Sequence, residues 1–364
     1  MESAPGARTV INGREVDYFA GTGYYELQGH PQLIKAAGEA LAKYGMSCAT
    51  SPAVYGNTPV HFQLEESAKR FFDAESILYY VSGCFGNSIL LEGLSDEYDV
   101  IFVDRESHYS IMNAAYLVYK PVVEFADRDP EDLRKKIKEF LDPTQRPVVI
   151  CDGIFPISGE ISPIPDYIDV LKDIEGAIIC VDDAHATGII GKNGHGTFEY
   201  FGLEGENRYT AGTLSKALGG HGGIITGNKS LIEKLIVKST IPRACSSATI
   251  PAAAATAKGL DILYNNPGLR KQLWDNVSYG KRAFRKMGFE ISDTPVPIIC
   301  LQSKEKNDFK TLQAELFKHG IAVTYLPSGA YTGVPKNGAL RISVFSSHTA
   351  EQLEHLVDQV KRRV

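Results

Sequence analysis

The sequence predicts an α/β protein with a large, mostly parallel β-sheet sandwiched by helices, plus a smaller α+β domain. Short apolar runs alternate with helical segments between residues 77 and 239, the pattern of a parallel sheet with crossover helices. Polar clusters follow several of these runs, where open α/β sheets bind ligands. The length of 364 residues suggests about two domains. We expect residues 1–45 to begin the small domain, 46–252 to form the large domain and 253–364 to complete the small domain.

Composition limits the classes of partner. The chain is 43% hydrophobic and 23% charged, with a formal net charge of −6, so a nucleic-acid partner is not expected. The apolar runs are too short for a membrane span, and the first residues do not predict a secretory signal. The six cysteines have neither metal-ligand nor disulfide spacing, which predicts reduced thiols, a cytoplasmic location and no metal site.

Local signals place the individual elements. Asn12-Gly13 between two β-prone runs predicts a hairpin, and a helix is expected from Pro31 to Tyr44. That helix carries four apolar side chains on one face: Ile34, Ala37, Leu41 and Tyr44. Further strands are expected at 77–81, 100–103, 122–125, 148–151, 177–180, 223–227, 298–301, 321–324 and 340–344. Further helices are expected at 58–72, 88–94, 131–141, 230–239, 252–264, 268–287 and from the capping box Thr349-x-x-Gln352 onward.

A lysine lies inside the glycine-rich, apolar segment 210–223. Lys216 has little reason to be there as a solvated charge, and burial lowers the pKa of an amine because it disfavours the ammonium form. A neutral amine forms a Schiff base with an aldehyde, and the aldehyde cofactor to expect is pyridoxal 5'-phosphate (PLP). The hydroxyls of Thr213 and Ser215 can bind its phosphate. Alone, the segment also fits an ordinary surface loop.

A second polar cluster follows the apolar run 177–180. Asp182 and His185 lie at the carboxyl end of this expected strand. PLP needs a carboxylate at its pyridine nitrogen, which suits Asp182, and His185 can reach the ring hydroxyl or stack on the ring. Each residue alone fits a capping Asp or a loop His. The Asp-x-x-His pair, followed by Ser-Lys-Ala-Leu-Gly at Lys216, favours a PLP site.

Five segments resemble one known family, and the resemblance runs nearly end to end. The segments are VDDAHATGIIGKNGHG, GTLSKALGGHGG, DRESHYSI, GNTPVHFQLE and ALRISVFSSHT. The family is the α-oxoamine synthases, which are fold type I PLP-dependent acyltransferases. The resemblance therefore implies that fold, with 46–252 as the PLP-binding domain.

The resemblance adds contacts to PLP. The turn Gly83-Cys84-Phe85 lies between an expected strand and a helix, where free amides bind anions, and in the family it holds the phosphate. His108 matches a family histidine that stacks on the PLP ring, and Asp152 matches a segment that borders the site. Without the resemblance, these residues would fit an ordinary βα turn and loop.

Two further residues gain roles only from the resemblance. Ser247 matches a hydroxyl by which the neighbouring subunit contacts the phosphate, so we expect a homodimer with shared active sites. Arg341 alone fits a salt-bridged residue of an apolar strand. In the family it clamps the amino-acid carboxylate, which the planar guanidinium binds through two hydrogen bonds.

The reaction implied by the resemblance is the decarboxylative condensation of an amino acid with an acyl-CoA or other acyl thioester. Its products are an α-amino ketone, CoA and CO2, and Lys216, Asp182, His108 and His185 are the expected catalytic residues. An aminotransferase or aldolase of the same fold is the first alternative, and a non-catalytic partner subunit is the second. Thr22 stands near the substrate entrance where the family has Asn, so it is a substrate-binding candidate and the choice of amino acid and acyl chain stays open. Pro52 replaces a family Arg, and the family's leading helix is missing from this sequence.

Overall fold

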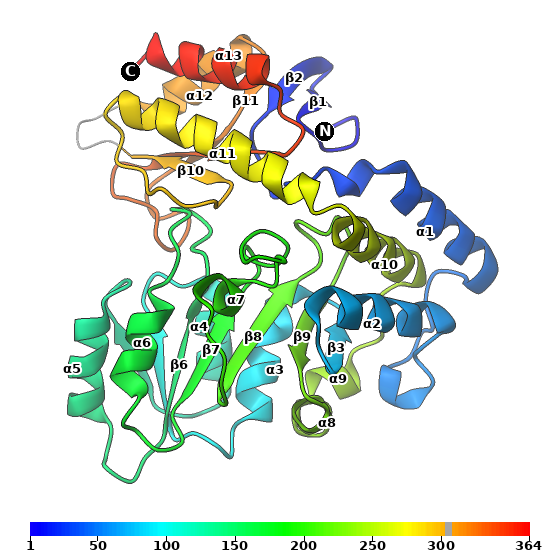
Figure 1. The fold of residues 1–364 in the computed structure, drawn as a ribbon, viewed down its shortest axis with the longest axis vertical. Helices are drawn as coiled ribbons and strands as arrows, with labels where there is room; N and C mark the ends of the chain where they lie inside the picture. Colours follow the sequence, from blue (N-terminus) through cyan, green and yellow to red (C-terminus); the bar gives the residue numbers. More distant parts are fainter. Residues whose placement is uncertain (303–307) are drawn as a thin grey trace.

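The computed structural model describes residues 1–302 and 308–364. A large sheet flanked by helices forms the lower part of the molecule in Figure 1, and two short sheets with their helices form the upper part. Within the described residues, no helix combines the length and apolar character needed to cross a membrane. All six cysteines are free thiols.

The large sheet has seven strands in the order β3-β9-β8-β7-β6-β4-β5. Five neighbouring strands run parallel, and β9 is antiparallel to both β8 and β3. The strands are β3 (Ser76–Tyr80), β4 (Val100–Asp104), β5 (Val122–Phe125), β6 (Pro147–Asp152), β7 (Ile178–Asp182), β8 (Arg208–Thr213) and β9 (Gly223–Gly227). The prediction of a mostly parallel sheet is confirmed.

Helices cover both faces of this sheet. Ile101 and Val103 of β4 pack in a core with one set of helices, whereas Val100 and Phe102 pack in a core with the other. The first set is α3 (Gly86–Gly93), α4 (Tyr109–Leu117) and α8 (Lys229–Lys238); the second includes α5 (Pro130–Phe140), α6 (Ile164–Leu171) and the short α7 (Thr197–Phe201). Because side chains alternate across a strand, burial on both faces explains why β4, β6 and β7 are apolar at each position before their terminal aspartate.

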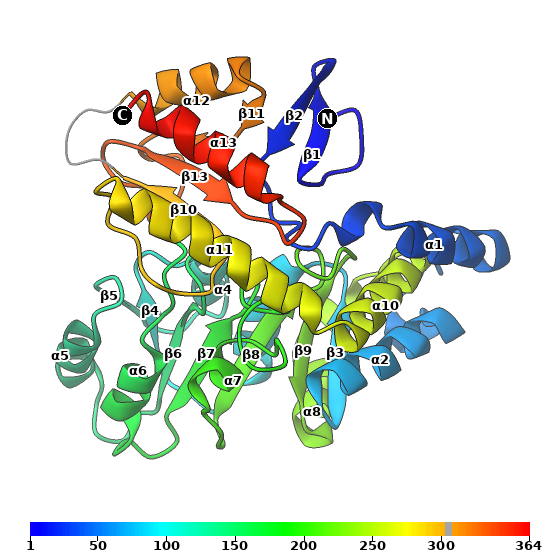
Figure 2. The same ribbon diagram turned by 45° about the horizontal axis from the view of Figure 1, so that its top comes forward.

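Three helices pack together beside the β3 edge of the sheet. They are α1 (Pro31–Tyr44), α2 (Pro59–Phe72) and α10 (Ile250–Asn265), and Figures 1 and 2 show them side by side. The helix predicted over 31–44 is confirmed, but it buries Leu33 and Ala40. Ile34 and Leu41 stay 60% and 43% exposed in the single chain.

The upper part joins the two ends of the chain. One sheet pairs β1 (Arg8–Ile11) and β2 (Arg14–Tyr18) with β11 (Ile321–Ala322), and the other has β10 (Ile298–Leu301), β13 (Ala339–Ser343) and β12 (Thr324–Leu326). The helices of the upper part are α11 (Gly268–Lys286), α12 (Phe309–Lys318) and α13 (Ala350–Lys361). The short α9 (Ile241–Ala244) belongs to the lower part and lies near α8. The single strand expected at 321–324 is therefore two strands in different sheets. The Asn12-Gly13 hairpin and the Thr349/Gln352 capping box are confirmed.

The carboxyl edge of the large sheet gathers polar residues. Asp104, Asp152, Asp182 and Thr213 are the last residues of β4, β6, β7 and β8, which are neighbours in the sheet. Asp152 and Asp182 are partners in the β6–β7 register. Parallel strands thus bring to one edge residues that are far apart in the sequence.

Candidate active site

A cavity of about 240 Å³ opens at this edge. Most of the residues expected from the sequence to form the site lie on its walls. The lining residues are Ser82, Gly83, Cys84, His108, Ser110, Asp152, Asp182, Ala184, His185, Thr213, Ser215 and Lys216.

Lys216 lies in the turn that follows β8. Its carbonyl oxygen accepts hydrogen bonds from Gln28 Nε2 at 2.8 Å and from the Gly219 amide at 3.1 Å, which fix the turn. Burial lowers the pKa of the Lys216 amine to about 8, although the negative charges of Asp182 and Asp152 oppose this shift. The neutral amine is therefore far more abundant near neutral pH than in an ordinary lysine.

Asp182 is held from two sides by uncharged donors. Asn87 Nδ2 donates to its Oδ2 at 2.6 Å, and the Ala184 amide donates to its Oδ1 at 2.9 Å. Asp182 and Asn87 are both buried. These bonds fix the carboxylate in orientation at the end of β7, where it lines the cavity.

Asp152 supports the loop that carries His108. The His108 amide donates to Asp152 Oδ2 at 2.6 Å, and burial together with the Asp182 charge raises the pKa of Asp152 well above its ordinary value. His108 Nδ1 lies 2.7 Å from Ser110 Oγ, and its ring stacks on Tyr109 with centroids 4.2 Å apart. Burial lowers the pKa of His108, which favours a neutral ring.

His185 is buried beside Tyr24. Its Nδ1 lies 3.0 Å from the Tyr24 hydroxyl. Burial lowers the pKa of His185 well below its ordinary value, and the positive charges of Lys216 and Arg341 act in the same direction. His185 is therefore a neutral imidazole at neutral pH.

The turn predicted to bind phosphate lies against the end of β8. Gly83–Phe85 is a single 3-10 turn before α3, and a Cβ added at Gly83 would lie 2.7 Å from Thr213 Oγ1, so this close packing requires glycine. The hydroxyls of Thr213 and Ser215 both donate to the Gly222 carbonyl, at 3.0 and 3.4 Å. Gly83 and Cys84 line the cavity, whereas the Phe85 side chain is exposed and Phe85 is not among the lining residues.

Arg341 and Thr22 are not among the residues that line the cavity, although the charge of Arg341 acts on His185 and Lys216. Arg341 is a buried cation of β13. Its guanidinium donates to the Pro156 carbonyl at 2.7 Å, to Ser343 Oγ at 2.8 Å and to the Gly21 carbonyl at 3.3 Å. Thr22 is half-buried and follows Gly21.

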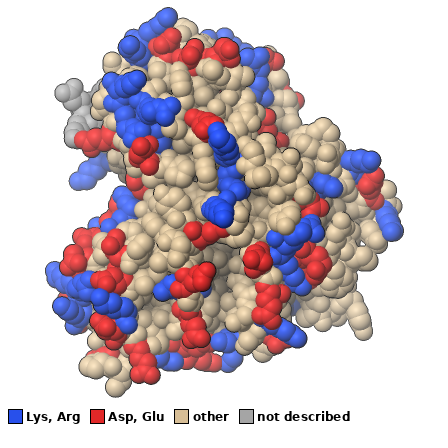
Figure 3. All heavy atoms as spheres, in the orientation of Figure 1, with Lys and Arg blue, Asp and Glu red and all other residues tan. Residues whose placement is uncertain are grey.

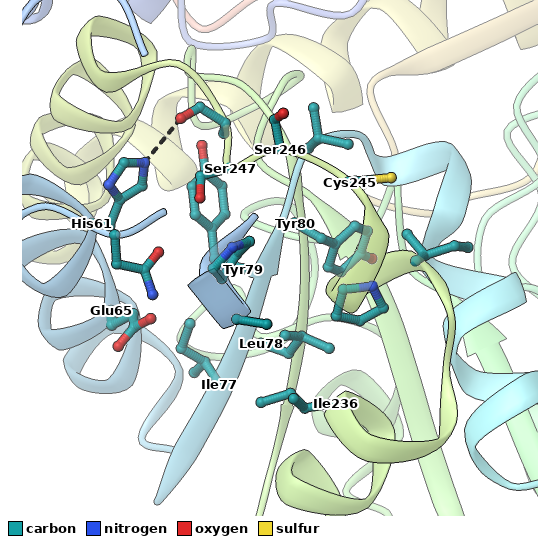
Figure 4. Close-up of a pocket in the computed structure, with 17 residues that line it drawn as sticks. His61, Glu65, Ile77, Leu78, Tyr79, Tyr80, Ile236, Cys245, Ser246 and Ser247 are labelled. Atoms are coloured by element: carbon teal, nitrogen blue, oxygen red, sulfur yellow. Dashed lines mark hydrogen bonds between the residues drawn. The ribbon is translucent and has the colours of Figure 1, made fainter. Parts of the chain in front are cut away.

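Ser247 lines a different cavity, of about 230 Å³, which also includes His61, Glu65 and Tyr79 (Figure 4). The Ser247 hydroxyl donates to the Gly56 carbonyl, and its amide donates to the Thr50 carbonyl at 3.3 Å. Within one chain, the structure therefore does not bring Ser247 to the cavity that contains Lys216.

Comparison with known proteins agrees with this geometry. The family model for aminotransferase class I and II matches residues 21–360. The 8-amino-7-oxononanoate synthase of Thermoanaerobacter pseudethanolicus is 35% identical over 97% of this chain and 89% of that protein. The enzyme of the same name from Alkaliphilus metalliredigens is 31% identical over 100% of this chain and 91% of that protein.

The chain belongs to the α-oxoamine synthase family. It is a PLP-dependent acyltransferase whose reaction is the decarboxylative condensation of an amino acid with an acyl thioester. Its fold is that of fold type I PLP-dependent transferases. A serine palmitoyltransferase from S. paucimobilis superimposes with a TM-score of 0.90 at 24% identity, covering 98% of this chain and 89% of that one. The Sphingomonas wittichii serine palmitoyltransferase gives a TM-score of 0.89 at 27% identity, with the same two coverages.

The residues of the cavity fit PLP. Lys216 offers an amine for the aldehyde, Asp182 a carboxylate for the pyridine nitrogen, and the glycine turn with Thr213 and Ser215 offers donors for the phosphate.

Sequence reasoning missed three side chains that hold the site. Tyr24 contacts His185, Asn87 contacts Asp182, and Ser110 contacts His108. Asn87 could have been considered because it follows the Gly83–Phe85 turn, and Ser110 because it lies two residues after His108. Tyr24 is 161 residues from its partner His185, and no local signal links the two.

Proposed function

We propose that Lys216 both binds PLP covalently and acts as the base of the condensation. The observation that supports this most directly is the position of its amine in one cavity with Asp182, His108 and His185. When the amine of the amino acid replaces Lys216 on the cofactor, the freed Lys216 Nζ would take the proton from the α-carbon of the amino acid. A pKa of about 8 suits this step because it provides neutral amine close to neutral pH.

Three residues hold the cofactor ring in this proposal. When bound, PLP supplies an electron-withdrawing ring that stabilises negative charge at the substrate α-carbon. Asp182 would keep the pyridine nitrogen protonated, and its carboxylate is fixed for this by two hydrogen bonds. His108 would stack on the ring, and His185 would bind its ring oxygen. The neutral state of both histidines supports these roles, since neither brings a positive charge to the site.

The phosphate and the amino-acid carboxylate have separate binding groups. The amides of Gly83 and Cys84 and the hydroxyls of Thr213 and Ser215 form the phosphate site. The Phe85 amide, also expected from the sequence, instead donates to the Ser82 carbonyl at 3.0 Å. Both hydroxyls donate to the Gly222 carbonyl in this structure, so each would turn its single hydrogen from that carbonyl to the phosphate when PLP binds.

Arg341 is the proposed clamp for the amino-acid carboxylate, and Thr22 lies near it. The partners of the Arg341 guanidinium are neutral carbonyl and hydroxyl oxygens, so its charge is available to a substrate anion. The 8-amino-7-oxononanoate named for the relatives is itself an α-amino ketone. We propose a product of this class for the present enzyme.

We also propose a homodimer in which Ser247 reaches the partner's phosphate site. Large apolar side chains are exposed on the segments around the Ser247 cavity: Val54, Tyr55, Phe62 and Val237. Tyr55 is 95% exposed, and Ile34 and Leu41 add apolar surface on α1. In Figure 3, charges of both signs are spread over much of the surface, whereas the edge at lower right, near the α1–α2 connection, is mostly uncharged. A second copy covering this surface would account for both features.

We also propose a cytoplasmic location for the protein, which the free thiols support.

Borohydride reduction followed by peptide mapping tests the first part of the proposal. The reduced cofactor should be found on Lys216, and an adduct on another lysine would refute the assignment. A panel of amino acids with short and long acyl-CoAs should then release thiol and CO2 in equal amounts. Transamination would release neither, and an aldolase would not require a thioester.

A further inference from the structure

Tyr24 contacts His185, which lines the cavity, and is influenced by the charge of Arg341. Its hydroxyl lies 3.0 Å from His185 Nδ1, and the positive charge of Arg341 lowers the pKa of the same hydroxyl, against the larger effect of burial. All three side chains are more than nine-tenths buried. The neighbouring residues in the sequence do not indicate a role for Tyr24, because its contact with His185 joins residues 161 positions apart.

Burial fixes the direction of the Tyr24–His185 hydrogen bond. The Tyr24 side chain is fully buried, and its hydrogen-bond partner among the described residues is His185 Nδ1. A buried O–H without an acceptor is costly, so the hydroxyl donates its single hydrogen to Nδ1. Burial raises the pKa of Tyr24, so the hydroxyl keeps this hydrogen at neutral pH.

The single proton of the neutral His185 ring must then be on the other nitrogen. We propose that Tyr24 is a positioning residue that fixes His185 as the Nε2–H tautomer. Since Nδ1 is occupied, Nε2 is the nitrogen available to a ligand of the cavity that His185 lines. A donor at this position suits the anionic ring oxygen of PLP, which an unprotonated nitrogen would repel. This last step rests on the proposed role of His185.

The tautomer can be measured directly in the holoenzyme with 15N-labelled histidine. The signals of His185 are identified by their loss in His185→Asn. In the wild type, Nδ1 should give the resonance of an unprotonated nitrogen and Nε2 that of a protonated one. A His185 with its proton on Nδ1, or a doubly protonated ring, would overturn the proposal without the need for any Tyr24 variant.

Tyr24→Phe removes one oxygen atom and should shift both His185 signals toward a mixture of tautomers. Tyr25→Phe is the matched control, because Tyr25 is also buried and donates to the Gly188 carbonyl at 2.7 Å. It should leave the His185 signals unchanged. Equal spectra for the two variants would contradict the proposal.

PLP affinity provides a separate measurement. Tyr24→Phe should weaken PLP binding about fivefold, on the scale of one neutral hydrogen bond, and Tyr25→Phe should not. If His185→Asn leaves PLP affinity unchanged, the proposed contact of His185 with PLP is wrong, whereas the tautomer is still decided by the resonances.

Discussion

Within the described part of the chain, burial lowers the pKa of two lysines, Lys216 and Lys281, to about 8. Lys281 is buried, whereas Lys216 is half-buried. Their surroundings differ. Lys281 of α11 donates to the carbonyl and the hydroxyl of Thr294, at 3.0 and 2.7 Å, and is 1% exposed. Lys216 lines a cavity with two carboxylates and two histidines. A lowered pKa therefore reports burial in both places, and only the surroundings distinguish a lysine that can react from one that completes the packing of a domain.

Replacing each lysine should give the largest contrast. Lys216→Ala should lower the rate of condensation by at least roughly 10³-fold, because it removes both the covalent attachment and the base. Lys281→Met, which keeps the length and apolar stem, should leave turnover nearly unchanged. Release of thiol and CO2 measures both. A comparable loss of activity in both variants would show that lining the cavity is not what distinguishes Lys216 from Lys281.

Asp182 and Asp183 are adjacent and give a second comparison between a residue that lines the cavity and a buried residue that does not. Asp182→Asn should keep PLP bound but lower kcat by roughly 10²–10³-fold, since an amide cannot keep the pyridine nitrogen protonated. Asp183 is also buried, but its carboxylate accepts from the Thr197 amide at 2.9 Å and from the Thr197 hydroxyl. Asp183→Asn should therefore lower the unfolding temperature while kcat stays close to the wild-type value. The reverse result would exchange the roles of the two carboxylates.

The sequence predicted the sheet, and most of the residues that it predicted for the site line one cavity, because strand ends and their polar residues are local features. Asp182, His185 and Lys216 follow or precede recognisable strands, and they meet because parallel strands end at one edge. The strand Arg208–Thr213 was not predicted, because its sequence is polar and its burial comes from neighbouring strands. The helix Ile164–Leu171 was also not predicted. The contact of Tyr24 with His185 depends on tertiary packing, which no local pattern reports. The division at residues 45 and 252 stays a prediction.

Arg341→Lys tests the proposed clamp and should have a smaller effect. A lysine cannot form the two parallel hydrogen bonds of a guanidinium with a carboxylate, so the KM for the amino acid should rise about tenfold or more. The KM for the acyl thioester should change little. An increase confined to the thioester would place Arg341 at the other substrate.

The smallest expected effect is a shift in the pH at which Lys216 is chemically modified, with Lys281 as the comparison. In enzyme freed of PLP, an amine-reactive reagent should modify Lys216 with a midpoint near pH 8, because the neutral amine reacts and predominates above its pKa. Asp182→Asn should move this midpoint to lower pH, since the Asp182 charge favours the ammonium form. Lys281 has the same pKa, but both of its hydrogen bonds must break before the reagent can reach it, so it should react much more slowly at every pH. Equal modification of the two lysines at pH 8, measured by peptide mapping, would show that Lys216 is no more accessible to the reagent than Lys281. The assignment of Lys216 as the lysine that binds PLP would then rest on the borohydride adduct alone.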